Sequence, residues 1–344
     1  MDRGCRRRRV DRRSDPIAHA PFRNLNIAGL AAAAILAAAG TAHADEFFLV
    51  RDENPLTRSF YLPLPSDSRL SDGVDLSATL ALSNTLNVES RTGENLLVDG
   101  ESDTLRITFD NSLYQSWRYR FTLPIIHDSG GFLDSAIDHY HRWFGFNQGF
   151  RPDYPRGQFV YSYSGRGNID LTHSGTSLGD ISGELGWFPV DDGHRTLSLW
   201  GGLEAPTGSV SKLTGDGAWD GALWAHYALR WTKWQLAAEL GVAQPFGDEL
   251  FAGYAHRTSL FGRFAVTRAL GSRWSLRAQV DGQTGRVEDS TTRFLGPSLQ
   301  LTVGAARALS ERWRIEFGFA EDVAVNTAPD ITFFLGIRRQ SSAK

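Results

Sequence analysis

Among its 344 residues the chain has one cysteine and, beyond residue 44, no apolar run long enough for a membrane helix. The cysteine, Cys5, lies in a basic N-terminal stretch that we expect to be removed. Disulfide frameworks, thiol nucleophiles and thiolate metal sites all require cysteine, so none is predicted for the remaining chain. A lipid anchor would also need a cysteine after the cleavage point, and none is present there.

The first 44 residues have the pattern of a secretory signal peptide. A basic stretch that includes Arg6–Arg9 precedes a small apolar run at 28–39, and Ala42-His43-Ala44 provides the small-x-small pattern of a cleavage site. The apolar run, about a dozen residues long, is too short to span a bilayer as a helix. We therefore expect cleavage after Ala44, which leaves 300 residues, Asp45–Lys344.

The predicted mature chain is acidic. The signal contains eight of the 36 Lys+Arg and three of the 39 Asp+Glu residues, which leaves 28 against 36 and a net charge of −8. This charge argues against nucleic acid as a partner. The full chain has 40 aromatic residues (10 Trp, 21 Phe, 9 Tyr) and 35 Gly. That composition favours many strands joined by turns that contain glycine.

Alternation of apolar and polar residues is the main structural signal. It is clear in SWRYRFTLPI (116–125), RWSLRAQVDG (273–282) and RWRIEFGFAE (312–321). A period of two predicts strands with two unlike faces. A soluble β-sandwich would also alternate, but here the polar face is dense in charges of both signs and the strands are about ten residues long. Both features favour a transmembrane barrel.

Short and long connections alternate along the chain, as in outer-membrane barrels. The short ones have the sequences YQ, DDGH, TK, GS and SE. We predict an all-β fold, a transmembrane antiparallel β-barrel of about twelve strands spanning 73–339, with an N-terminal periplasmic extension at 45–72 and a C-terminal tail at 340–344. The predicted strands are 74–89, 102–113, 116–126, 176–188, 195–205, 219–231, 234–243, 257–269, 273–284, 293–308, 312–321 and 331–339.

Tryptophans mark one edge of this predicted barrel. Trp117, Trp234, Trp274 and Trp313 each follow a short turn by one or two residues and point to the apolar face, and Trp231 enters one of these turns. They predict an aromatic belt at the periplasmic interface. The expected location is the outer membrane of a Gram-negative bacterium. The expected partners are outer-membrane lipid, the barrel-assembly machinery and an unidentified small solute, and we expect a monomer.

Five stretches together resemble one protein family. They are NPLTRSFYLPLP (54–65), LLVDGE (96–101), SGGFLDSAIDHYHRWFGFNQGFRPDYPRG (129–157), SLGDISGEL (177–185) and GGLEAPTGSVSKLTGDG (201–217). The chain is similar in these stretches to proteobacterial outer-membrane proteins known as domain of unknown function 3187. The resemblance implies the barrel fold and the outer-membrane location. It implies no activity.

The longest predicted loop, 127–175, follows the third strand on the outer side. Apolar residues at three- and four-residue spacings within it predict a short amphipathic helix at 131–144. Part of this loop, 127–157, is predicted to constrict or plug the barrel. Its candidate residues are Asp134, Asp138, His139, His141, Arg142, Trp143, Arg151 and Asp153.

Three hypotheses compete for the predicted helix. His139 and His141 lie two residues apart, so their rings diverge on a helix and are poorly placed to bind one zinc ion. Asp134 and Asp138 could form a pair of catalytic carboxylates, but both are expected to face solvent with Arg142 as an ion-pair partner. The third hypothesis is packing of the apolar face into or over the barrel mouth, and we favour it. No metal and no cofactor is predicted.

Outer-membrane phospholipases, which are twelve-stranded barrels, suggest a comparison at NIDLTHSGTSLGD (168–180). Those enzymes place a histidine and a serine on one face of a strand. His173 and Ser174 are adjacent, so on a strand they point to opposite faces and cannot pair as base and nucleophile. Asn168 lies five residues from His173, in a predicted loop. No catalytic residue is predicted, although the hydrolase alternative stays open.

Charged residues of both signs are predicted to line the lumen. They allow two interpretations: a structural ion-pair network that fills the barrel, or a selectivity lining that steers a polar solute. The apolar residues and prolines of 45–65 suggest that this segment enters the lumen from the periplasmic side. The predicted lining residues are Arg106, Arg118, Arg120, Arg230, Arg263, Arg277 and Arg314, opposite Asp110, Glu184, Glu204, Glu239, Asp281 and Glu316.

The sequence therefore predicts a channel or transporter for a small solute, gated or constricted by loop 127–157. Two alternatives remain: an outer-membrane, phospholipase-like hydrolase, and a closed structural or adhesive barrel.

Overall fold

The structure, a computed structural model, describes residues 46–67, 70, 73–114, 116–135, 137, 139, 143, 153–256, 258–324 and 326–341. These residues all belong to one compact unit within 38–344. No helix in this part of the chain is long and apolar enough to cross a membrane. The predicted signal peptide and its cleavage site lie outside the described residues.

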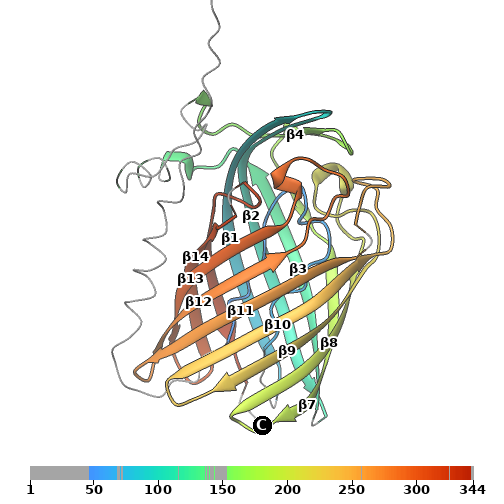
Figure 1. The fold of residues 1–344 in the computed structure, drawn as a ribbon. Coiled ribbons are helices and arrows are strands. Elements are labelled where there is room, and N and C mark those ends of the chain that lie inside the picture. The colour runs from blue at the N-terminus through green and yellow to red at the C-terminus, as the bar shows by residue number, and fades with distance from the viewer. Residues whose placement is uncertain are drawn as a thin grey trace, which may run out of the picture. The chain divides into compact units, whose positions relative to one another are not determined.

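Antiparallel strands form a closed barrel of twelve, as predicted (Figure 1). The ring runs β1-β2-β3-β7 and then in chain order from β8 to β15, which pairs with β1 from Leu76↔Arg339 to Asn84↔Ile331. The strands are β1 (Asp75–Arg91), β2 (Glu94–Leu113), β3 (Trp117–Ser129), β4 (Val160–Ser164), β5 (Asn168–Leu171), β6 (Gly175–Leu178), β7 (Ile181–Asp191), β8 (Arg195–Ala205), β9 (Asp220–Arg230), β10 (Trp234–Pro245), β11 (Ser259–Leu270), β12 (Trp274–Gln283), β13 (Ser298–Ala308), β14 (Trp313–Asp322) and β15 (Ile331–Arg339).

The two faces of each strand differ as the alternation requires. On β3, the Phe121 side of the strand is exposed (54%), whereas Arg120 is buried in the lumen. The same pattern holds around the ring, so the outer surface is apolar and the inner surface is charged. A charged side chain tolerates an inward position only where it finds partners, and a bilayer-facing position must be apolar. The amino-acid pattern therefore sets which face turns inward.

Tryptophan and arginine pair across neighbouring strands at the short-turn rim. The register places Trp234 opposite Arg268 and Trp274 opposite Arg307. The two guanidinium carbons lie 4.8 and 5.2 Å from the indole ring centroids, within cation–π range. The rings face outward at the level predicted for the aromatic belt, and the arginines extend that belt with positive charge.

The long loop is more ordered than predicted, and the β1–β2 hairpin is longer. β2 begins at Glu94, not at 102, and β3 leaves it after Ser129↔Glu101. Beyond this point β4 takes over the free edge of β2, and β5 pairs with β4. β6 and β7 then pair with successive parts of β3. β4 and β5 were predicted as loop because each has only four or five residues, whereas β6 and β7 together occupy the region of the single strand predicted at 176–188.

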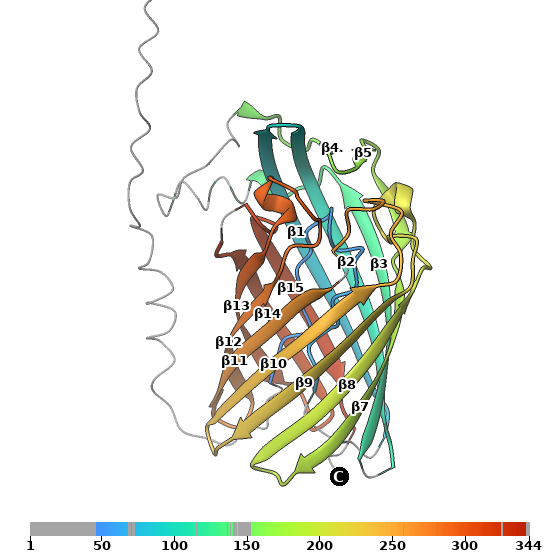
Figure 2. The ribbon, with the colours of Figure 1, turned by 45° about the vertical axis from the view of Figure 1, so that its right-hand side comes forward.

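The short helix predicted at 131–144 is not confirmed. Six of its fourteen residues lie outside the described ones. Among the described residues, Ile137 N donates to Leu133 O (2.9 Å), as in a helical turn. Leu133 and Ile137 pack against Ile331, with Leu82 and Phe319 alongside. These three residues alternate with lumen-facing neighbours, so they lie on the outer face of the barrel. This stretch is accordingly seen outside the wall in both views (Figures 1 and 2).

Residues 46–67 lie inside the barrel, as the blue trace within the strands in Figure 2 shows. The segment starts beside Arg230, at the short-turn end of β9, and reaches the long-loop end at Asn54, whose amide donates to Phe294 O. A turn follows, in which Arg58 N donates to Asn54 O, and the chain then descends to Ser66 beside Glu239. We call residues 46–67 the plug. It contains no β-strand.

Candidate functional site: the plugged lumen

The lumen wall contains every residue predicted to line it. Their side chains occupy inward positions on β2, β3, β7 to β12 and β14, and most are buried. Arg118, Arg120 and Arg277 are among the largest fully buried side chains of the protein. Their role in selecting a solute remains a prediction, but their immediate partners include the plug.

Charged wall residues hold the lower end of the plug. Glu46 Oε1 accepts from Arg230 Nε (2.9 Å), and its other oxygen lies 3.3 Å from His226 Nε2. Arg338 donates to Phe47 O (3.0 Å). The first plug residues therefore satisfy wall charges that would otherwise face an apolar chain, as buried charges require.

Aromatic rings of the plug fit against glycines and arginines of the wall. The Arg277 guanidinium carbon lies 4.2 Å from the Phe48 ring centroid. A side chain at Gly304 would place its Cβ 2.9 Å from Phe48 Cζ, and one at Gly202 would place its Cβ 2.2 Å from Tyr61 Oη. These two inward glycines thus leave space that the plug rings occupy.

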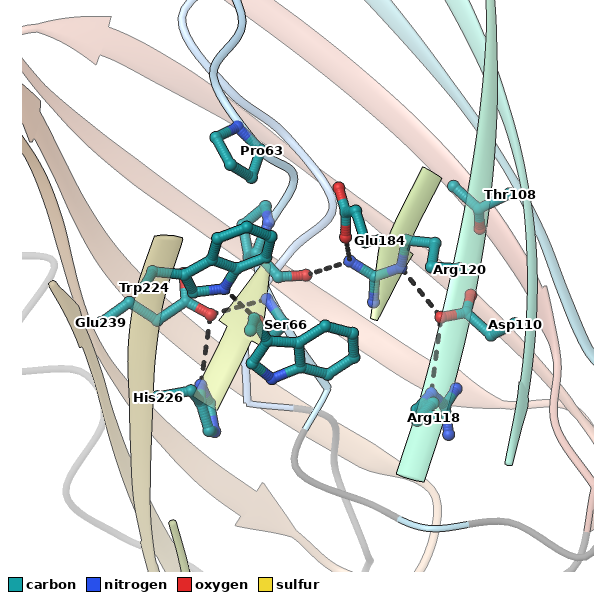
Figure 3. A network of polar contacts seen from close by, with 12 residues as sticks. Pro63, Ser66, Thr108, Asp110, Arg118, Arg120, Glu184, Trp224, His226 and Glu239 are labelled. Atoms are coloured by element: carbon teal, nitrogen blue, oxygen red, sulfur yellow. Dashed lines mark hydrogen bonds and ion pairs between the residues drawn. The ribbon is translucent and has the colours of Figure 1, made fainter. Parts of the chain in front are cut away.

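The descending limb of the plug lies between two groups of wall charges (Figure 3). On one side, Arg120 Nη1 donates to Pro65 O (2.9 Å), while its Nε donates to Asp110 (2.8 Å). On the other side, Glu239 accepts from Ser66 N (2.6 Å). Trp224 Nε1 donates to Ser66 Oγ (2.7 Å). The wall therefore recognises main-chain groups of this limb from two opposite directions.

Glu239 is the centre of the second group. It accepts from Arg263 Nη1 (2.7 Å) and lies 3.2 Å from His226 Nδ1. Arg263 also donates to Pro63 O and lies 3.1 Å from Asp281. Because His226 contacts Glu46 as well, this network joins the start and the end of the plug through the wall.

Two further ion pairs join plug and wall in the upper lumen. Glu53 accepts from both terminal nitrogens of Arg106, and both side chains are almost fully buried. Arg58 donates to both oxygens of Asp128 (3.0 and 2.6 Å) and to Ser102 Oγ. Paired donors that meet both carboxylate oxygens fix orientation as well as position.

The plug tip ends in an apolar cluster formed by the loops. Leu56 and Phe60 pack there with side chains from β2, β4, β5 and the later outer loops. The other members are Leu96, Val98, Phe159, Tyr161, Tyr163, Ile169, Leu213, Leu250, Phe251, Val287, Phe294 and Leu295. We call this cluster the dome, and it covers the barrel mouth above the plug.

Two small cavities lie beside the plug in the described lumen. One of about 20 Å³ lies near Asp110, Arg118 and Arg338, and one of about 10 Å³ lies near Asp52 and Asp281. Volumes of this size hold about one water molecule each. At these two places the plug and the wall leave no space for a larger solute.

The described candidates from loop 127–157 lie away from the lumen. Asp134 accepts from Asn84 and from Gly157 N, and His139 Nδ1 contacts Ser135 O. Trp143 and Asp153 are exposed. The constriction by this loop stays a prediction; within the described residues the lumen is occupied by the plug. Asp138, His141, Arg142 and Arg151 lie outside the described residues.

The stretch compared with phospholipases has no enclosed reaction site. His173 and Ser174 are both exposed between β5 and β6, and His173 Nδ1 contacts Thr172 Oγ1 (3.3 Å). Among the described residues, no group of three or more His, Cys, Asp or Glu side chains could hold a metal ion.

The plug residues that bind the wall were absent from the predicted site. Glu46, Glu53 and Arg58 are three of the six charged residues in 46–67, a stretch rich in apolar residues that precedes the first strand. Charges of both signs among apolar residues are a signal of buried ion pairing. Their partners lie between 53 and 184 residues away, which no local pattern reveals.

Fold and site together define the class: a plugged, twelve-stranded β-barrel. The chain belongs to the family described as protein of unknown function (DUF3187), whose model matches residues 28–340. No curated protein matches it.

The first solved structure below shows the same fold, and the other two are similar at a lower TM-score. The COG4313 outer membrane channel from Pseudomonas putida F1 is 14% identical, with 80% of this chain and 98% of that chain covered and a TM-score of 0.56. The Ralstonia pickettii toluene transporter TbuX is 10% identical, with 79% and 90% covered and a TM-score of 0.41. The CymD monoaromatic hydrocarbon channel is 12% identical, with 88% and 98% covered and a TM-score of 0.41.

Proposed function

We propose that this protein is an outer-membrane channel for a small solute and that the plug, residues 46–67, is its gate. The carrying observation is that the lumen is filled by a separate segment without β-strands, rather than by the wall's own side chains. Such a segment can move without breaking the hydrogen-bond ladder of the barrel. The outward apolar face and the tryptophan belt support the location, and we infer a monomer in contact with lipid.

The polar contacts of the plug are suited to exchange. Arg120, Arg263 and Arg338 bind carbonyl oxygens of the plug main chain, and Glu239 binds one of its N–H groups. Water or a polar solute can replace a main-chain group at each of these positions. The wall charges also pair with one another, as Arg120 does with Asp110, so a wall arginine released by the plug keeps a partner in the wall.

The apolar contacts explain why the gate is closed at rest. Leu56 and Phe60 are buried in the dome, and Tyr61 and Leu62 pack against wall aromatics. Burial of a large apolar side chain stabilises by about 1.5–3 kcal/mol. Several such contacts keep the plug in place until a solute or a partner displaces it.

Ion conductance in a planar bilayer tests the proposal. The refolded intact chain should be silent in KCl, whereas the variant lacking 46–67 should form steady channels because its lumen is cleared. The matched control lacks 139–152 of the outer loop and should remain silent. Persistent silence of the plug deletion, in a sample shown to be folded by its heat-dependent gel mobility, would contradict the gate.

A second variant guards against misfolding of the deletion. Arg120→Ala combined with Arg263→Ala removes two contacts to the main chain of the plug but leaves the chain intact. We expect brief openings that the intact protein lacks. If both variants fold and neither conducts, the results favour the alternative hypothesis of a closed structural barrel.

A further inference from the structure

The outer part of the lumen wall is rich in carboxylates. Asp128 is the last but one residue of β3, Glu204 faces inward near the end of β8, and Asp220 begins β9. Asp180 and Asp216 belong to the adjoining loops, where Gly208 N donates to Asp180 (2.7 Å). All five side chains are buried, with residue exposures of 6% or less.

Two of these carboxylates have an oxygen without a hydrogen-bond donor. Asp216 is 1% exposed and accepts from Ala218 N through one oxygen, while its Oδ2 has no partner. Asp220 is 2% exposed and accepts from Tyr61 N, while its Oδ1 has no partner. A buried carboxylate oxygen without a donor is costly, so this region is built to receive positive charge.

The plug places guanidinium groups in this region. Arg58 is held by both oxygens of Asp128, and its Nε donates to Leu213 O (3.1 Å), next to the loop that contains Asp216. Arg51 is directed by two plug carbonyls, Leu62 O and Arg58 O (2.8 Å each). On the wall, Arg286 donates to Tyr61 O and is the cation near Asp220.

We propose that Asp128, Asp180, Glu204, Asp216 and Asp220 form a binding site for a small organic cation, of the guanidinium or ammonium class. Arg58 and Arg51 occupy this site while the plug is in place. A cationic solute that reaches the site competes with Arg58 for Asp128, and its binding favours withdrawal of the plug tip. This inference rests on the proposed channel and names the class of its solute.

The raised pKa of Asp216 agrees with a site whose negative charges are only partly balanced by nearby cations. Burial, and next the neighbouring Asp220, raise the pKa of Asp216 to about 8. A bound cation favours the ionised carboxylate and so reverses this shift. Within a water-poor site, the same carboxylates repel anions and attract cations.

Chemical rescue of Arg58→Ala tests the site without opening the channel. The variant should unfold at a lower urea concentration in detergent micelles than the intact chain. Millimolar methylguanidinium chloride should restore much of the lost stability, because it fills the space beside Asp128. Methylurea, its uncharged analogue, and equal concentrations of KCl should not.

Arg195→Ala is the matched control. Arg195 pairs with Asp192 at an exposed turn, where its side chain is 61% exposed. Methylguanidinium should leave this variant unchanged. Rescue of both variants to the same degree, or of neither, would overturn the proposed cation site.

Reversal potentials separate this inference from the channel itself. In a KCl gradient, the variant lacking 46–67 should pass K⁺ several-fold better than Cl⁻, and Asp128→Asn with Asp220→Asn should remove most of this preference. Asp192→Asn, at the exposed turn before β8, should leave it. A conducting but anion-selective pore refutes the cation site alone. A silent pore refutes the channel, and the rescue experiment still decides the site.

Discussion

The plug and the outer loop both lie outside the barrel strands in the sequence. Their sequences are alike in one respect, because both combine apolar residues with charged ones. The structure places them on opposite sides of the wall. Plug residues Glu53 and Arg58 form ion pairs with inward wall residues. The loop residues Leu133 and Ile137 instead lie on outward apolar residues of β1, β14 and β15.

This difference shows that each segment lies against the barrel face, inner or outer, that complements its side chains. Inside the barrel, Glu46, Glu53 and Arg58 each meet a wall charge of opposite sign. Outside, Asp134 meets the neutral Asn84 amide and a main-chain N–H. A segment with charges at Glu46, Glu53 and Arg58 matches only the inner face, so charge complementarity determines which segment can close the channel.

The largest loss of stability is expected when one buried ion pair between the plug and the wall is removed. Glu53→Ala leaves Arg106 buried without its carboxylate, which costs about 3–5 kcal/mol. We expect a lower urea midpoint, followed by tryptophan fluorescence, together with channel openings as the plug is released. In Glu53→Ala/Arg106→Met the unpaired charge is absent, so most of the stability should return. Failure of the second substitution to recover any stability would count against the pairing.

Sequence patterns predicted the wall better than the contents of the barrel. The outward tryptophans and the strict alternation at 312–321 depend on nearest neighbours in the chain, so the strands β8 to β15 were located within a few residues. The inward charges followed from the same alternation. The Arg106–Glu53 contact spans 53 residues and depends on barrel closure, which a local pattern does not contain.

The upper part of the hairpin was missed for a related reason. The alternation in β2 is interrupted at Asp99, Gly100 and Glu101. Leu96 and Val98, which precede them in the sequence, are nevertheless buried in the dome. Tyr161 and Tyr163 do alternate with polar residues, and both are fully buried. β4 was not predicted as a strand only because it is so short.

A matched pair of glycine substitutions compares the two segments directly. Gly202→Ala places a methyl group 2.2 Å from Tyr61 Oη in the plug, and Gly131→Ala places one 1.8 Å from Glu101 Cδ under the outer loop, at a φ of +66°. Each should cost about 1–3 kcal/mol by overpacking, with added backbone strain at Gly131. Gly202→Ala should raise channel activity in the bilayer. Gly131→Ala should leave the channel silent and increase protease cleavage within 127–157.

Tyr61→Phe provides the control for the first substitution. It removes the hydroxyl that the new methyl group would meet, so Gly202→Ala/Tyr61→Phe should return to the silent state. If Gly131→Ala also produced channels, the outer loop would contribute to gating and the distinction between the two segments would fail.

The smallest expected effect is a change in pH dependence at the plug tip. The pKa of Asp216 is raised to about 8 by burial and by Asp220, from 3.8 in the unfolded chain. Between these values unfolding releases a proton, so the closed state loses stability as pH rises from about 4 to about 8. Asp216→Asn removes this contribution, and its urea midpoint should fall less between pH 5 and pH 8. Asp248→Asn is the comparison, because burial also raises the pKa of Asp248 and its removal should flatten a separate part of the curve. An Asp216→Asn profile parallel to that of the intact chain would assign the pH dependence to other groups.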